Sequence, residues 1–154
     1  MKKSLIIAAI IIGCSTKKQE APVEFSEPIG RKIMGNWLNE SLTVEMSTFK
    51  NTDKDSTYFI DFRESSDITR PLGVLFMEDG TYHARFVRNN KDTLTALGVW
   101  NTSYDSIKIS FELTTNSYHV QFDGDHISLI GKVDYDGDSI KDDVLKTRLL
   151  RKPL

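Results

Sequence analysis

The chain has 154 residues, with 20 Lys and Arg against 22 Asp and Glu, and its formal net charge is -2. So small a charge argues against a nucleic-acid partner, which a strongly basic surface would attract. The hydrophobic fraction of 39%, with two Trp, five Tyr and eight Phe, is enough for one core and predicts one compact domain. The single cysteine, Cys14, excludes an internal disulfide framework and a zinc site with two or more thiolates.

The first thirteen residues have the pattern of a secretory signal peptide. Lys2 and Lys3 precede an apolar run over residues 5–12, and Gly13 is a small residue before a cleavage point. The run rises only about 12 Å as a helix, which is far less than the roughly 30 Å hydrocarbon core of a membrane. We therefore predict that residues 1–13 are removed and do not span a membrane.

Residues 11–14, Ile-Ile-Gly-Cys, resemble the lipobox of bacterial lipoproteins. The resemblance implies that Cys14 carries a diacylglycerol on its thiol and acyl chains of the palmitate type, which anchor the protein in a bilayer. Residues 14–30 are then expected to be a lipidated N-terminus and a flexible tether. Ser15 resembles the outer-membrane sorting pattern of Gram-negative lipoproteins, which implies a place in the cell envelope, on the outer membrane, facing the periplasm or the cell surface.

Residues 31–154 are predicted to form an all-β domain, because short alternating segments rich in Val, Ile, Phe, Tyr and Thr recur between Gly, Asn and Asp turns. Outside the two hairpins described next, strands are expected at residues 37–49, 58–62, 94–100, 107–113 and 144–151. Eight to ten strands in sequence order indicate an antiparallel up-and-down meander closed into a barrel, which leaves no exposed edges. A β-sandwich has the same local pattern and stays an alternative.

Two hairpins have a predicted register. Residues 117–130 accommodate a two-residue turn at Asp123-Gly124, and residues 72–86 accommodate a three-residue loop that ends at Gly80. The partners expected on the apolar faces are Phe122–Asp125, Val120–Ile127 and Tyr118–Leu129 in the first hairpin, and Phe76–Tyr82, Val74–Ala84 and Leu72–Phe86 in the second.

The Gly35-Asn36-Trp37 segment, at the start of the first long strand, resembles the Gly-x-Trp signature of lipocalins. Together with residues 76–82, residues 98–100 and a last strand ending in Leu-Arg, it is similar to lipocalin-like lipoproteins of Bacteroidota. The resemblance implies a lipocalin-like barrel whose base is closed by Trp37, with Arg151 or Arg148 stacked on the ring.

The resemblance also implies a binding function: a membrane-tethered lipoprotein that holds a small apolar ligand in its barrel. The aromatic residues that line or fill the interior are expected to be Tyr82, Phe86, Phe111, Tyr118 and Phe122. The alternative is a non-enzymatic structural or interaction module that docks on another envelope protein and has a calcium-stabilised hairpin.

The calcium hypothesis comes from an acidic segment, Asp134 to Asp142. Its proposed ligands are the carboxylates of Asp134, Asp136, Asp138 and Asp142 and the carbonyl of Ile140. The spacing resembles calcium loops of the EF-hand and β-hairpin types, except that Ser139 replaces glycine at position 6 and Leu145 replaces glutamate at position 12. A bound calcium would be structural, and a solvated acidic turn is the alternative.

No catalytic residue and no organic cofactor are predicted, because the chain lacks Gly-x-Ser-x-Gly and the glycine-rich nucleotide motifs. His119 and His126 fall on the outward face of their hairpin without a third ligand, so they are interpreted as surface histidines. A lipocalin-type enzyme would need a titratable group inside the cavity, and none is expected there.

Overall fold

The computed structural model describes residues 28–49, 52, 54–64, 69–88 and 92–153. The predicted signal peptide, Cys14 and most of the tether lie outside these residues. The elements are a short helix, α1 (Ile29–Ile33), and the strands β1 (Gly35–Met46), β2 (Ser56–Asp61), β3 (Thr69–Phe76), β4 (Thr81–Arg88), β5 (Asp92–Ser103), β6 (Ser106–Phe111), β7 (Thr114–Asp123), β8 (His126–Val133) and β9 (Asp143–Arg151). Among the described residues, no helix has the length and apolarity needed to cross a membrane.

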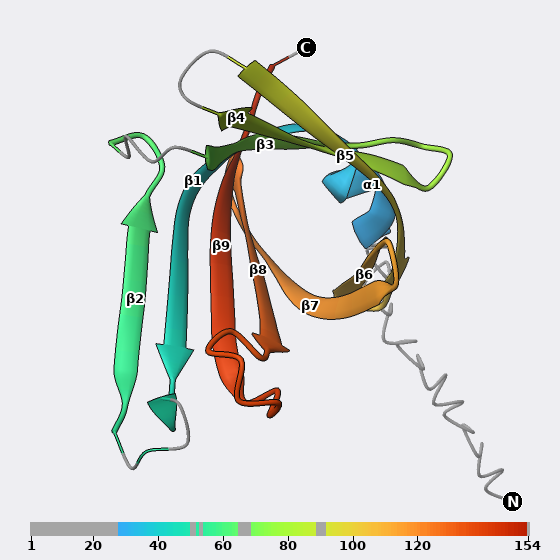
Figure 1. Cartoon of the computed structure of the whole chain (residues 1–154). Helices are drawn as coiled ribbons and strands as arrows, with labels where there is room; N and C mark the ends of the chain where they lie inside the picture. The colour runs from blue at the N-terminus through green and yellow to red at the C-terminus, as the bar shows by residue number, and fades with distance from the viewer. Residues whose placement is uncertain (1–27, 50–51, 53, 65–68, 89–91, 154) are drawn as a thin grey trace, which may run out of the picture.

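The strands form one closed antiparallel barrel. From β3 to β9 each strand pairs with the next, and β1 completes the ring by pairing with β3 on one edge and β9 on the other (Figure 1). The ring therefore has eight strands, with β2 as an additional ninth strand outside it. The predicted lipocalin-like barrel is confirmed, and the β-sandwich alternative is wrong.

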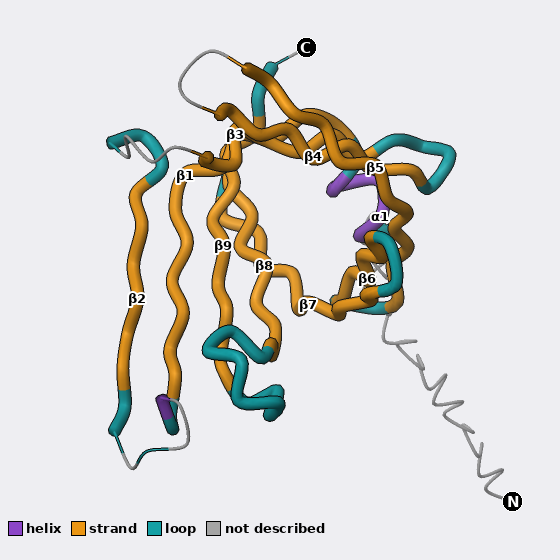
Figure 2. The backbone as a smooth tube through the Cα atoms, viewed as in Figure 1, coloured by secondary structure: helices purple, strands orange, loops and turns teal. Residues whose placement is uncertain are grey.

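The first strand changes partners along its length. Gly35 to Leu38 pair with β3, whereas Ser41 to Met46 pair with β2 on the same edge. A bulge between Asn39 and Ser41 separates the two halves, and a bulge bends the strand that carries it. As a result β2 stands beside the far half of β1, away from the ring (Figure 2). The simple meander therefore needs one correction, since the second strand does not belong to the ring.

The β3–β4 hairpin has most of the predicted register. Phe76 pairs with Tyr82 and Val74 with Ala84, and Gly80 has the expected positive φ of 82° in the connecting loop. The predicted Leu72–Phe86 pair is wrong, because a register shift between Pro71 and Gly73 brings Pro71 opposite Phe86.

The β7–β8 hairpin differs from the prediction by two residues. Its turn is Gly124-Asp125, so that Asp123 faces His126, Phe122 faces Ile127 and Val120 faces Leu129. Gly124 has a φ of 57°, and a glycine at the first turn position is what a type II′ hairpin turn requires. A shift of two residues leaves each side chain on its predicted face, so the separation of apolar and polar residues holds.

The hydrophobic core fills the barrel at the end that α1 covers. Ile33 of the helix is fully buried, and α1 contacts β5. The buried cluster consists of Ile33, Trp37, Val74, Phe76, Tyr82, Trp100, Ile107, Val120, Ile127, Leu129 and Leu149. Five of these core residues, Val74, Phe76, Tyr82, Leu129 and Leu149, also line a cavity, which therefore adjoins the core.

Candidate functional site

The base of the barrel is closed by Trp37 and Arg151. Trp37 is 1% exposed, and its Nε1 donates a hydrogen bond of 2.7 Å to the carbonyl of Ile33 in α1. The Arg151 guanidinium lies 4.3 Å from the centroid of the Trp37 ring and donates to the carbonyls of Met34 and Lys32. Of the two arginines considered for this role, Arg151 is therefore the one that stacks on the tryptophan.

Gly35 completes this closure for a steric reason. Its φ is 120°, a conformation that side chains other than glycine rarely adopt, and a Cβ at this position would lie 3.3 Å from Arg151 Nη1. The glycine of the Gly-x-Trp motif therefore leaves room for the guanidinium that covers the tryptophan.

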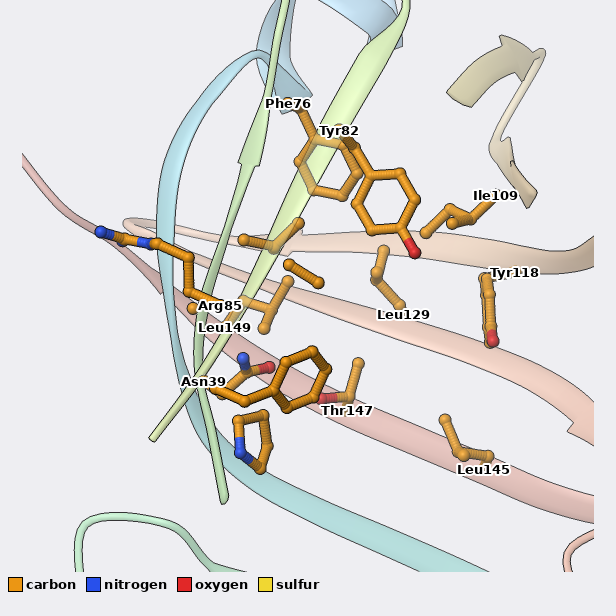
Figure 3. A pocket seen from close by; sticks show the side chains of 15 residues that line it. Asn39, Phe76, Tyr82, Arg85, Ile109, Tyr118, Leu129, Leu145, Thr147 and Leu149 are labelled. Carbon is orange, nitrogen blue, oxygen red and sulfur yellow. The ribbon is translucent and has the colours of Figure 1, made fainter. Parts of the chain in front are cut away.

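A cavity of about 210 Å³, partly open to solvent, adjoins the core of the barrel. Its lining comes from seven strands and is largely apolar (Figure 3). The lining residues are Asn39, Pro71, Gly73, Val74, Phe76, Tyr82, Ala84, Arg85, Phe86, Ile109, Tyr118, Leu129, Leu145, Thr147 and Leu149.

Three of the five predicted lining aromatics, Tyr82, Phe86 and Tyr118, do line this cavity. The other two do not. Phe111 is the last residue of β6, two residues beyond the lining residue Ile109, and is 37% exposed. Phe122 is 41% exposed and lies near the closed end, where Lys32 Nζ is 5.7 Å from its ring centroid.

Small residues beside the two tyrosines shape the cavity. A Cβ on Gly98 would lie 2.2 Å from Tyr82 Cε1, and a Cβ on Gly131 would lie 2.6 Å from Tyr118 Cδ1. Each ring therefore occupies the space that a side chain on the neighbouring strand would otherwise take. Since contacts this short are sterically forbidden, the glycines fix where the rings can lie.

The cavity contains few polar groups, and several are already engaged by the protein. Thr147 Oγ1 donates to the carbonyl of Ser41 at 3.3 Å, and the Tyr118 side chain hydrogen-bonds with Asn116. Within the described part of the chain, the Asn39 amide and the Tyr82 hydroxyl have no hydrogen-bond partner. These two groups are available to a bound molecule.

Burial raises the pKa values of the Tyr82 and Tyr118 hydroxyls above the ordinary value of 10.0, because an apolar surrounding disfavours the charged phenolate. Both phenols are therefore neutral at physiological pH and can donate a hydrogen bond.

The acidic loop between β8 and β9 brings three of its aspartates together. One carboxylate oxygen from each of Asp134, Asp136 and Asp138 lies within 4.8 Å of the others. Asp134 also accepts hydrogen bonds from the backbone N–H groups of Gly137 and Ser139, at 2.9 and 3.1 Å. Asp138 Oδ2 is buried and has no hydrogen-bond partner among the described residues. Three oxygen ligands and one unsatisfied oxygen are compatible with a hard cation such as calcium.

Asp142 and Ile140, the other two residues predicted to bind calcium, have different hydrogen-bond partners. Asp142 is not part of the group of three, because its Oδ2 accepts hydrogen bonds of 3.3 Å from the hydroxyls of Ser47 and Thr48 after β1. The N–H of Ile140 donates to Asp138 Oδ1 at 2.7 Å, while a role for its carbonyl stays a prediction.

Asp143 is a structural residue that the sequence reasoning missed. It is 1% exposed, and its Oδ2 accepts hydrogen bonds from the backbone N–H groups of Tyr135 (2.6 Å) and Asp136 (3.3 Å). The alternation of β9 contained the signal, because Asp143 is in phase with the inward-facing residues Leu145 and Leu149.

The histidines of the β7–β8 hairpin contact separate carboxylates on the outside of the barrel. His119 Nδ1 lies 3.1 Å from Asp105 Oδ2, and His126 Nε2 lies 3.1 Å from Glu40 Oε2. The two histidines therefore do not share a site. The pKa of Asp105 is lowered mainly by the Ser106 hydroxyl, with His119 contributing.

The lining of the cavity contains no carboxylate, imidazole or thiol within the described residues. What it offers a ligand is apolar surface, the Asn39 amide, hydroxyl groups and the side chain of Arg85. A scan against protein-family models and a search of curated proteins found no match. Function is therefore inferred from the geometry of the cavity and the loop.

Proposed function

We propose that this protein is a lipid-anchored component of the bacterial cell envelope whose barrel binds one small apolar molecule. The observation that carries the proposal is the cavity of about 210 Å³ that adjoins the core and is lined mainly by apolar side chains. An apolar cavity of about 150 Å³ in another protein holds benzene, so this cavity is large enough for a molecule with one ring or for part of a larger ligand. The resemblance to lipocalin-like lipoproteins supports the same function.

Native mass spectrometry tests the binding function directly. The full chain would be purified in detergent from its own cell envelope and examined for a retained organic adduct. We expect an adduct on the unmodified chain and its loss from Ala84→Leu, because Ala84 lines the cavity and a larger side chain would fill it. His83→Leu is the matched control, since His83 is the next residue on β4 and faces the opposite way. A bare polypeptide in every sample would contradict the binding function.

The anchor is tested separately through Cys14. Replacement by serine removes the thiol that the lipobox resemblance implies is acylated. We expect Cys14→Ser to abolish incorporation of a labelled fatty acid and to release the protein from the membrane fraction. Incorporation that persists in Cys14→Ser would rule out this cysteine as the attachment site.

A second candidate function, a structural or interaction module with a calcium-stabilised hairpin, is favoured by the acidic loop. Asp134, Asp136 and Asp138 would hold the ion, and the buried Oδ2 of Asp138 would gain a partner. Calcium would also reduce repulsion between the carboxylates and so couple metal binding to folding.

Thermal unfolding with calcium, magnesium or a chelator separates this candidate from a solvated acidic turn. Calcium should raise Tm in the unmodified chain and in Asp142→Asn, but not in Asp138→Asn, because Asp142 lies outside the group of three. A Tm that is unaffected by calcium would eliminate the calcium-stabilised module.

A further inference from the structure

We infer that the molecule held in the barrel is electrically neutral and consists of an apolar body with one hydroxyl or carbonyl group, recognised by the Asn39 amide and the Tyr82 hydroxyl. The inference depends on the proposed binding function and adds the chemical class of the ligand.

Asn39 is the first group that points to this class. It lies on β1 opposite Leu149, which is 1% exposed, so both residues are on the inner face of the barrel. An asparagine amide has two donors and one acceptor, and none of them has a protein partner among the described residues. The amide is not among the buried side-chain atoms that lack a partner, so it is open to solvent in the cavity, and a ligand hydroxyl or carbonyl would replace water there.

Tyr82 is the second group. Its ring is held by a stacking contact with Phe76, at 6.2 Å between centroids, and by the close approach to Gly98. In Figure 3 the ring reaches from β4 toward Ile109, and the hydroxyl is at its tip. A hydroxyl on a ring fixed in this way can donate to or accept from a ligand with little loss of side-chain freedom.

The charge of the lining disfavours an ionised ligand. Among the described lining residues Arg85 is the only charged one. Arg85 lies between the lining residues Ala84 and Phe86, and its guanidinium extends away from the cavity, where Nη2 donates to Asn36 Oδ1 at 2.9 Å (Figure 3). Its buried Nε has no hydrogen-bond partner among the described residues, so benzoate is the probe that tests whether Arg85 can turn toward a ligand. A carboxylate or an ammonium group in the cavity would lose its hydration without gaining an ion pair, which is costly.

Four probes of similar size test the inference: toluene, benzyl alcohol, benzoate and benzylamine. Their dissociation constants would be measured by isothermal titration calorimetry on the full chain carrying Cys14→Ser. We expect benzyl alcohol to bind about tenfold more tightly than toluene, which corresponds to one satisfied hydrogen bond, and the two ions to bind more weakly than either.

Variants identify the groups responsible. Asn39→Leu and Tyr82→Phe each remove one polar group at similar volume, so at least one of them should abolish the preference for benzyl alcohol while toluene still binds. Thr147→Val is the matched control, because Thr147 lines the cavity but its hydroxyl is engaged by Ser41. Retained toluene binding also shows that a variant is folded.

The possible results distinguish a failure of the inferred ligand class from a failure of the proposed binding function. Tightest binding of benzoate or benzylamine, equal binding of toluene and benzyl alcohol, or a preference that survives both substitutions would overturn the inference and leave the binding function standing. If none of the four probes binds the unmodified cavity, the binding function itself fails, and the inference fails with it.

Discussion

The Tyr82 ring lies over Gly98, its cross-strand partner, so closely that a Cβ at residue 98 would be 2.2 Å from Tyr82 Cε1. The same Cβ would be 2.4 Å from the carbonyl oxygen of Ser110 on the other side of β5. This pair of residues shows how the barrel has both a dense core and a cavity. Because residue 98 has no side chain, the Tyr82 ring can lie directly against β5, and the space beside the ring remains part of the cavity.

Gly98→Ala should therefore destabilise the protein even though it adds one methyl group. The new Cβ meets a ring and a backbone oxygen, and overpacking of this kind costs about 1–3 kcal/mol. Urea unfolding measures the loss, with Thr95→Ala on the outer, exposed face of β5 as the control. Equal stability of Gly98→Ala and the unmodified chain would show that the ring is free to move.

Arg151→Ala should lower the free energy of unfolding by about 2–4 kcal/mol, because it removes the cation–π contact with Trp37 and two hydrogen bonds from a charged donor to backbone carbonyls. Arg151→Lys should recover only part of this loss, since an ammonium cannot reproduce the planar guanidinium. Arg148→Ala is the control on the same strand. Its pair with Asp123 is at the surface, and Glu40, whose side chain is 14% exposed, keeps His126 and Arg63 as neighbours, so we expect a change of about 1 kcal/mol or less. A similar loss for both alanine variants would contradict the special role of Arg151.

Asp143→Ala should destabilise the barrel by about 2–3 kcal/mol, because it deprives two backbone N–H groups of a buried carboxylate acceptor. Asp142→Ala removes only hydrogen bonds of 3.3 Å to two hydroxyls and should cost much less. Thermal unfolding in the presence of a chelator compares the two variants without a contribution from metal. If Asp142→Ala is the more damaging, the assignment of the structural acceptor to Asp143 is wrong.

The buried tyrosines predict how the protein responds to alkaline pH. The pKa values of Tyr82 and Tyr118 are raised above 10.0 in the folded state, so the fold favours the neutral phenols. Their contribution to stability is fully present below the ordinary pKa and is lost as pH rises through the folded-state values. Burial also raises the pKa of Tyr135, so near-ultraviolet absorbance of phenolate should show three late-titrating tyrosines, one fewer in Tyr82→Phe and one fewer in Tyr118→Phe. A titration that neither substitution alters would contradict the burial of these hydroxyls.

The barrel and the faces of its strands could be predicted because they depend on local patterns. Alternation placed Val120, Ile127 and Leu129 on the buried face, and the core contains all three. The resemblance to lipocalins predicted that an arginine of the last strand stacks on Trp37, but it left Arg148 and Arg151 as alternatives, and the structure selects Arg151.

The features that could not be predicted depend on long-range geometry. The bulge after Asn39 decides that β1 leaves β3 and pairs with β2, and no local pattern marks that exchange. The cavity is lined by inward-facing side chains that lie at the same height in the barrel. The sequence does not give this height, so Phe111 and Phe122 were expected in the lining although they do not belong to it. The alternation of β9 indicates that Asp143 faces inward, but its partners, the N–H groups of Tyr135 and Asp136, belong to an irregular loop that no periodic pattern predicts.

The pairing of β1 with β9 has a consequence for how the chain folds. Arg151 bonds to Met34, 117 residues earlier in the sequence, and the ring closes only when these two ends meet. While the polypeptide is being synthesised, the edge of β1 that pairs with β9 therefore stays unpaired until the final strand is available. Such a contact order makes closure a slow, late step, and the unfinished barrel is the species most exposed to aggregation or to capture by a chaperone.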